Sequence, residues 1–172
     1  MTPDERRELP TDPDPADAAP RSRPVHARPL LWVVVAAGGL LGTAARDLVS
    51  RALPHPADGW PTATFAVNVA GAFVLGVLLE ALVRGGPDGG WRRLARLGVG
   101  TGLCGALTTY SSLAVEIDLL ARRGNWAVAA GYAAATVCAG LVATTVGILL
   151  AAGWHRRRQP AAAPLEPRAR AR

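Results

Sequence analysis

GLCGALTTYSSLAVE, residues 102–116, lies within a long apolar part of the chain but is itself unusually polar. It holds two glycines, two threonines, two serines, a tyrosine and a glutamate within fifteen positions. In a lipid bilayer, polar backbone and side-chain groups must find partners inside the protein. A polar cluster at such depth therefore indicates a packed or water-lined interior rather than a surface that faces lipid.

The rest of the chain of 172 residues shows why a membrane is the relevant surrounding. Its apolar residues form four long blocks, at 30–48, 62–83, 97–115 and 125–154. A bilayer core needs about 20 predominantly apolar residues per helix. Helices of a soluble bundle would carry polar residues at every third or fourth position, which these blocks do not. The sequence therefore predicts an all-α, multi-pass integral protein of the cell membrane with four transmembrane helices.

The predicted transmembrane domain covers residues 30–154 and lies between two polar tails. Residues 1–29 contain seven prolines among Asp, Glu and Arg, which predicts a disordered N-terminal tail. Residues 155–172 predict a second, basic and disordered tail. The links between the blocks are short and rich in turn residues, so consecutive helices are expected side by side and antiparallel.

The net charge of +6 comes from 19 basic residues, all of them arginine, and 13 acidic ones. The arginines flank the apolar blocks, as in WHRRRQ (154–159), where membrane proteins usually carry them. This distribution argues against nucleic acid as a partner. Cys104 and Cys138 lie inside apolar blocks without CxxC spacing or a nearby histidine, so neither a redox pair nor a metal site built on them is expected.

Polar residues inside the predicted helices are functional candidates by default. Thr64 and Asn68 are four residues apart, so both point to one face of the second helix. Each candidate has a plainer alternative: an asparagine can bond to neighbouring backbone and fix packing, and Arg46 can reach the lipid headgroups. Threonines often bond to the carbonyl four residues earlier, which is the expectation for those of the fourth block.

The third block is expected to contain a broken helix. The glycines of GVGTGLCG (98–105) weaken the helix, and the four hydroxyls of TTYSS (108–112) compete for its backbone partners. Irregular backbone at membrane depth is tolerated where it is buried in protein or lines a watery cavity, and its free carbonyls can bind a hard cation. Next to Thr64 and Asn68, such a break indicates an ion pathway. Hydroxyl and amide donors without a carboxylate at mid-depth suit a small anion.

Over nearly all of residues 30–152 these motifs resemble the Fluc/CrcB family of fluoride channels. GGLLGTAARDLVS (38–50) is similar to the family's glycine-rich first helix, which ends in an arginine. TFAVNVAGAFVLG (64–76) is similar to its second-helix signature with a central asparagine, and GLCGALTTYSS (102–112) to its third-helix signature. The resemblance implies a passive, fluoride-selective channel that exports cytoplasmic fluoride and relieves fluoride toxicity. It also implies a dual-topology dimer, in which two subunits insert antiparallel and form two fluoride pathways.

The resemblance also implies roles for particular residues. A structural sodium ion would lie at the dimer centre, held by the backbone carbonyls of Gly105 and Thr108. The fluoride pathway would be lined by Arg46, Thr64, Asn68, Tyr110, Ser112 and Leu113. At positions 110 and 113 the family has phenylalanines whose ring edges face the ion. Tyr110 keeps a ring, whereas Leu113 has none.

The arginines are divided unevenly between the two predicted sides of the membrane. Fifteen belong to the tails and the second link, and four, including Arg46, belong to the other side. If the five arginines farthest from the membrane are left out, ten arginines remain on the side of the tails and four on the other side. This excess predicts that both tails lie in the cytoplasm. A chain that inserts in both orientations should be nearly balanced. We therefore hypothesise one half of a heterodimer, while a homodimer and a non-conducting or partner-dependent subunit remain open alternatives.

Two other classes of protein fit the sequence less well. A small multidrug antiporter also has four helices and dual topology, but it needs a carboxylate in its first helix, and residues 30–45 contain no Asp or Glu. An enzyme would need a nucleophile, a base and an orienting acid that converge, and all three histidines lie outside the apolar blocks. No catalytic residues are therefore expected.

Overall fold

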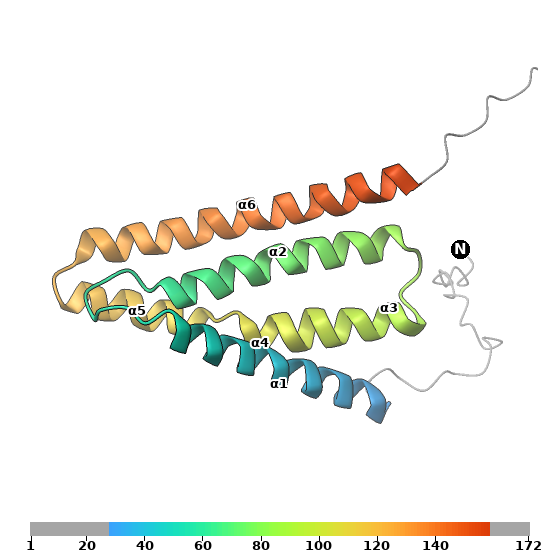
Figure 1. Cartoon of the computed structure of the whole chain (residues 1–172), viewed down its shortest axis with the longest axis horizontal. Coiled ribbons are helices and arrows are strands. Elements are labelled where there is room, and N and C mark those ends of the chain that lie inside the picture. Colours follow the sequence, from blue (N-terminus) through green and yellow to red (C-terminus); the bar gives the residue numbers. More distant parts are fainter. Residues whose placement is uncertain (1–27, 159–172) are drawn as a thin grey trace, which may run out of the picture.

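The computed structural model describes residues 28–158, which form a bundle of four helical segments of membrane-spanning length (Figure 1). Three of these segments are single helices: α1 (Pro29–Ala52), α2 (Thr62–Arg84) and α6 (Trp126–Arg158). The third segment in chain order consists of four pieces, which are α3 (Gly90–Ala95), the π-helix η2 (Arg96–Cys104), α4 (Gly105–Leu107) and α5 (Tyr110–Arg122). The all-α fold with four spanning segments is therefore confirmed.

Both ends of the helical domain extend beyond the predicted limits. α1 begins at Pro29, one residue early, and proline suits the first turn of a helix. α6 continues to Arg158, so the prediction of a disordered tail from residue 155 is wrong for its first four residues. The helix continues because arginine is a good helix former and the first proline comes at position 160. The rest of both predicted tails, 1–27 and 159–172, lies outside the described residues.

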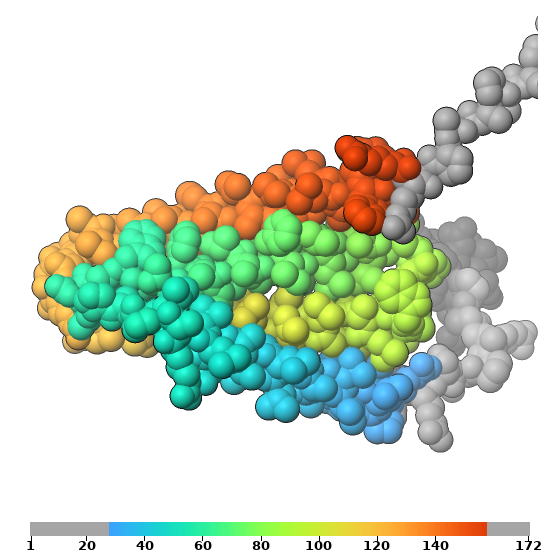
Figure 2. Space-filling model, in the orientation of Figure 1, coloured from blue at the N-terminus to red at the C-terminus, as the bar shows by residue number. Residues whose placement is uncertain are grey.

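The closest helix pairs are not consecutive in the chain. α1 packs mainly against η2 and α4, and α2 packs mainly against α6. In the space-filling view α2 accordingly lies between α6 and the third segment (Figure 2). The expected contact between consecutive helices holds for α5 and α6, whereas α1 touches α2 much less than it touches η2.

Glycines allow these pairs to approach closely. A Cβ atom on Gly38 of α1 would overlap the carbonyl oxygen of Gly98 in η2. A Cβ atom on Gly76 of α2 would lie 2.5 Å from the carbonyl oxygen of Thr144 in α6. Small residues at such positions are the usual means by which membrane helices pack. The same restriction applies to Gly42, Gly102 and Gly147.

Gly38→Ala should therefore destabilise the fold, because its Cβ has no room against the backbone of η2. Overpacking of this kind costs about 1–3 kcal/mol, so we expect a lower thermal unfolding midpoint in detergent. The matched control is Gly39→Ala, whose Cβ would lie 4.0 Å from the nearest atom, the Gly102 carbonyl oxygen. Alanine also favours a helix over glycine by about 1 kcal/mol, so the control should unfold no earlier than the wild type. Equal losses in both variants would contradict the packing of α1 on η2.

The π-helix η2 was not predicted from the sequence. It occupies RLGVGTGLC, nine residues that are separated from the break in the third segment by the three residues of α4. π-helical turns are rare and occur frequently at functional sites. Two of its residues, Gly102 and Cys104, are buried against the rest of the bundle. The irregular part of the third segment therefore starts before TTYSS and has close packing on its inner side.

Candidate functional site

The third segment breaks at Thr108 and Thr109, inside TTYSS. Both residues have extended backbone, with ψ angles of 154° and 121° respectively. The end of α4 leaves its last four carbonyls without helical partners, and the start of α5 leaves N–H groups in the same state. The predicted break in the third helix is thus confirmed and lies between Leu107 and Tyr110.

Asn68 of α2 holds the broken backbone through both ends of its amide. Its Oδ1 accepts a hydrogen bond from the Thr109 N–H at 2.8 Å, and its Nδ2 donates to the Thr109 carbonyl oxygen at 3.1 Å. The side chain therefore satisfies two backbone groups that the break would leave unpaired. An amide nitrogen carries two hydrogens, so one N–H of Asn68 is left for another acceptor.

The hydroxyls of TTYSS bond mostly to one another and to nearby backbone. Thr109 is buried, and its Oγ1 caps α5 by accepting a hydrogen bond from the Ser112 N–H at 3.1 Å. The same oxygen lies 3.1 Å from Ser112 Oγ and 3.2 Å from Ser111 Oγ. Thr108 Oγ1 donates to the Cys104 carbonyl at 2.9 Å. Thr109 was not among the predicted site residues, although a threonine directly before a helical run is a recognisable cap.

A carboxylate about two helical turns beyond the break receives two hydrogen bonds from other helices. Thr64 Oγ1 of α2 donates to Glu116 Oε1 at 2.6 Å, and Tyr132 OH of α6 donates to Oε2 at 2.7 Å. The Tyr132 side chain is completely buried, and the Trp60 ring packs edge-on against it at a centroid distance of 5.4 Å. Glu116 therefore links α2, α5 and α6. Tyr132 was not among the predicted site residues. The sequence feature that could have indicated it is a tyrosine hydroxyl within residues 125–154, a block of thirty residues without a charge.

The fourth-block threonines follow the expected pattern with one exception. Thr136 and Thr145 donate to the carbonyls four residues earlier, at 2.7 and 2.8 Å. For these two, the predicted back-bonding is confirmed. Thr144 instead donates across to the Ala72 carbonyl of α2 at 3.3 Å, so the prediction is wrong there. The close approach of α2 and α6 brings this acceptor within reach.

Two cavities lie on either side of the break. The first has a volume of about 530 Å³ and lies between α2, the third segment and α6. Of the predicted site residues it is lined by Asn68, Gly105, Thr108, Tyr110 and Leu113. The second has a volume of about 300 Å³ and is lined by the other three, Arg46, Thr64 and Ser112. Thr109 borders both cavities, so the structure places the broken backbone between two groups of predicted residues rather than bringing all of them together.

The outer side of the first cavity is exposed. The Tyr110 side chain is 83% accessible, and Gly105 is also exposed. A Cβ atom on Gly105 would meet no atom within 4 Å. Leu113 is half-buried and also packs near Tyr132 and Leu120. Tyr110 and Gly105 therefore face outward from their own bundle.

The carbonyls at the break are the candidate ligands for a cation. Those of Gly105 and Thr108 belong to the four that the end of α4 leaves free, and the Thr109 N–H is bonded to Asn68 instead. Backbone carbonyl oxygens are ligands that hard cations prefer. Within residues 28–158 no three His, Cys, Asp or Glu side chains gather in a way that could hold a metal ion. A cation at this place would therefore depend on the carbonyls.

Four spanning segments, a break at mid-length and a cavity on each of its sides are the architecture of a small membrane channel. Residues 33–148 match the family model described as CrcB-like protein, Camphor Resistance (CrcB). The chain belongs to this family, which confirms the resemblance stated from its motifs.

Several curated relatives are similar over most of their length. The fluoride-specific ion channel FluC 2 of Leifsonia xyli subsp. xyli is 48% identical over 137 residues, which cover 80% of this chain and 94% of the relative. FluC 1 of Cutibacterium acnes is 46% identical over 130 residues, covering 76% and 91%. FluC of Chlorobium luteolum is 42% identical over 129 residues, covering 73% and 95%. Together with its four spanning helices, this similarity makes the chain a multi-pass integral protein of the cell membrane.

Proposed function

We propose that this protein is a passive, fluoride-selective channel that exports cytoplasmic fluoride and so relieves fluoride toxicity. The observation that carries the proposal is the break at Thr108–Thr109, which Asn68 holds between a largely apolar cavity and a polar one. The names of the relatives supply the identity of the ion. Irregular backbone at this depth suits a watery pathway.

The arrangement matches what a small, strongly hydrated anion needs. Fluoride leaves water only where the protein offers hydrogen-bond donors in its place. Arg46 and Ser112 offer such donors in the second cavity, and the spare N–H of Asn68 and the Tyr110 ring with its hydroxyl lie at the first. Glu116 is occupied by the hydroxyls of Thr64 and Tyr132. Neutral HF enters a cell from acid surroundings and ionises inside, and the membrane potential then drives the anion out through a channel.

A second subunit and a structural sodium ion are part of the proposal. The exposed Tyr110 and Gly105 lie where a second, antiparallel copy or a paralogue would cover the first cavity. Gly105 and Thr108 supply two carbonyls from one chain, whereas a hard cation takes about six oxygen ligands. Two subunits that meet at their breaks would double the number of carbonyls. The sodium ion would then hold the two breaks together, and it would carry no part of the fluoride current.

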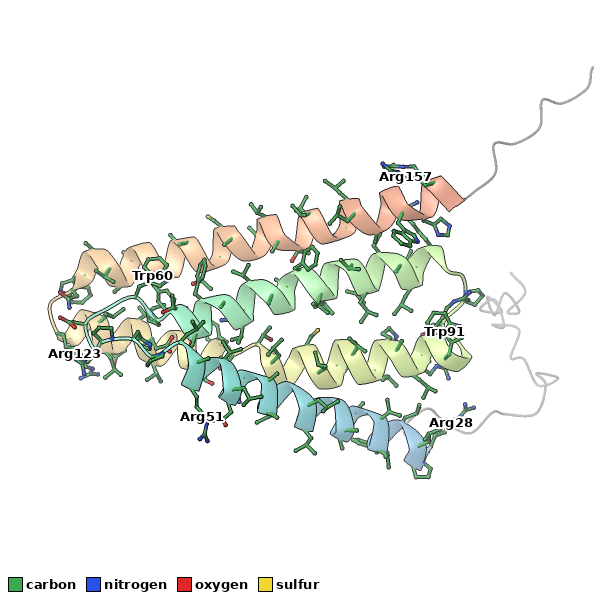
Figure 3. All side chains as sticks on the ribbon, in the orientation of Figure 1. Arg28, Arg51, Trp60, Trp91, Arg123 and Arg157 are labelled. Carbon is green, nitrogen blue, oxygen red and sulfur yellow. The ribbon has the colours of Figure 1, made fainter. Side chains whose placement is uncertain are left out.

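An alternative within the same family is a non-conducting or partner-dependent subunit. Leu113 supports this alternative, because it borders the first cavity and offers no ring edge to an anion. The arginine distribution supports a heterodimer, since most arginines of the described residues lie at the end where α2 and α6 finish. Figure 3 shows Arg28 and Arg157 at this end and Arg51 and Arg123 at the other.

For a chain with this charge distribution we expect a single orientation in the membrane. A cysteine-reactive label on a C-terminal tag should react only after the cells are opened, because the positive-inside rule places this end in the cytoplasm. The tagged chain would be expressed without any related gene, in a background where Cys104 and Cys138 are serines. Equal labelling from both sides of intact cells would contradict the heterodimer hypothesis and favour a dual-topology homodimer.

The proposed function is tested by growth in fluoride. A bacterial strain without its own fluoride exporters should grow at inhibitory fluoride concentrations when it produces this chain, and the benefit should be larger in acidic medium. The matched control is the Asn68→Ala variant produced at the same level. If the chain gives no benefit alone but does so with an oppositely oriented paralogue, the partner-dependent alternative is correct. No benefit in either case would contradict the proposal.

A further inference from the structure

Arginines crowd one end of the bundle, around the link between α2 and α3. This region contains four arginines (Arg84, Arg92, Arg93 and Arg96) and two acidic residues, which pair with three of the arginines. Arg84 is paired with Glu80 within the last turns of α2. Arg96 binds Asp88 at 2.7 Å, and Arg93 Nη2 donates to the Asp88 carbonyl at 2.7 Å. The hydrogen bond from Arg96 also lowers the pKa of Asp88, which favours the charged carboxylate that pairs with Arg96.

Arg92 is left without a carboxylate among the described residues. Its Nε is buried and has no hydrogen-bond partner. Its Nη1 lies 3.4 Å from the Pro87 carbonyl, which is near the limit for a hydrogen bond. The guanidinium lies 5.8 Å from the Trp91 ring centroid. Most of the donor capacity of Arg92 is therefore unused, and an uncompensated cation at a membrane interface is a site for an anion.

The backbone next to Arg92 leaves room for its side chain. Gly86 has a φ angle of +111°, which glycine adopts without strain, and a Cβ atom there would lie 3.0 Å from Arg92 Nη1. A Cβ atom on Gly85 would lie 3.0 Å from Arg92 Nε. The two glycines therefore let the guanidinium lie flat against the link instead of extending into solvent.

A groove of about 200 Å³ lies between Arg92 and the exposed side chains of Leu79 and Val83 on α2. Its wall on α2 is apolar and consists of Leu79, Leu82 and Val83. Its polar end is formed by Gly86, Asp88, Arg92 and Arg96. Val83 is 76% exposed and Trp91 is 68% exposed, and tryptophan is typical of the membrane interface. Figure 3 places Trp91 at this end of the bundle.

We propose that this groove binds an anionic phospholipid, with the headgroup phosphate at Arg92 and an acyl chain along Leu79 and Val83. The combination of an unpaired cation, an apolar wall that opens to lipid and an interfacial tryptophan matches a phospholipid rather than a soluble anion. The excess of arginines predicts that this end lies on the cytoplasmic side, and basic pockets between helices on that side are typical sites for anionic headgroups. The site is at the other end of α2 from Thr64, and it is independent of the proposed ion selectivity.

Native mass spectrometry of the full-length protein tests the proposal. The probes are phosphatidylglycerol and phosphatidylcholine with identical acyl chains, and soluble glycerol phosphate. We expect the protein to retain phosphatidylglycerol in preference to phosphatidylcholine, and Arg92→Gln to weaken that retention about fivefold, the effect of one cationic group at an anionic surface. Arg92→Lys keeps the positive charge, so it should reduce the retention of phosphatidylglycerol less than Arg92→Gln does. The matched control is Arg51→Gln at the opposite end, which removes an arginine paired with Asp47 and should leave retention unchanged.

Three results would overturn the proposal. The first is equal retention of phosphatidylglycerol by the wild type and by Arg92→Gln. The second is an equal loss in Arg51→Gln, which would indicate a general charge effect. The third is displacement of the lipid by an equimolar amount of glycerol phosphate, which would indicate a site for a free phosphate. Because Arg92 of α3 makes one long hydrogen bond and no ion pair among the described residues, its replacement should leave the thermal unfolding midpoint unchanged, so a failure to fold would be visible separately.

Discussion

Replacement of Asn68 by alanine should abolish fluoride efflux and destabilise the protein. The variant removes the acceptor of the Thr109 N–H and the donor to the Thr109 carbonyl together. Each buried backbone group left without a partner costs about 1–3 kcal/mol, so the two cost about 2–6 kcal/mol. The break between α4 and α5 would then lose its fixed geometry, and with it the position of the hydroxyls on both of its sides.

The experiment measures efflux and the thermal unfolding midpoint on the same preparation of each variant. Efflux from liposomes with Asn68→Ala should fall to the level of empty vesicles, and the midpoint should drop by several degrees. The matched control is Asn125→Ala. It removes the other asparagine side chain of the protein, which lies in the turn between α5 and α6 and away from the break. It should conduct like the wild type. Wild-type efflux from a well-folded Asn68→Ala protein would show that the break needs no support from α2.

The second large effect is expected at Glu116. Glu116→Ala removes the acceptor for the Thr64 and Tyr132 hydroxyls, and both donors are buried. Hydrogen bonds to charged groups are worth about 1.5–3 kcal/mol in water-soluble proteins, and side-chain bonds in membranes average about 0.6 kcal/mol. We therefore expect a total loss of about 2–4 kcal/mol. The link between α2, α5 and α6 at this end should loosen, which a lower unfolding midpoint would report.

Glu116→Gln separates the charge from the connection. A glutamine has the same shape, accepts from one hydroxyl through its carbonyl and donates to the other, so the free energy of unfolding of this variant should stay within about 1 kcal/mol of the wild-type value. Glu80→Ala is the matched control, since Glu80 pairs with Arg84 at the far end of α2 and contacts no residue of the break. Its midpoint should change little, as is usual for interfacial ion pairs. If Glu80→Ala and Glu116→Ala lose equal stability, the three-helix connection through Glu116 is not a main support of the fold.

The lengths of the apolar blocks were sufficient to predict the spanning segments, because a bilayer imposes a minimum length on every helix. The break was also predictable, since four hydroxyls within TTYSS compete with helical hydrogen bonds. The choice of Asn68 as a central residue followed from its rarity inside an apolar block. These are local features, and each can be recognised without knowledge of how the helices pack.

Features that depend on packing between helices were not predictable in the same way. The bond between Tyr132 and Glu116 joins two helices and requires their relative rotation to be known. The pairing of α1 with η2 and of α2 with α6 depends on glycine positions that fit opposite backbone atoms. The π-helix forms only if i→i+5 hydrogen bonds are more stable than the α-helical i→i+4 bonds in this glycine-rich segment, and the packing around it decides this. Thr108 and Thr109 are both suitable caps by residue type, and only the backbone angles show that Thr109 is the residue directly before α5.

A fluoride-selective passive pathway through this chain can be measured as fluoride efflux from liposomes that contain the purified protein alone, with valinomycin and a potassium gradient to set the voltage. Chloride-loaded liposomes serve as the control for selectivity. We expect rapid, voltage-driven loss of fluoride with no loss of chloride and no need for a pH gradient. Chloride loss at a similar rate, or no fluoride loss even after an oppositely oriented paralogue is added, would contradict this expectation.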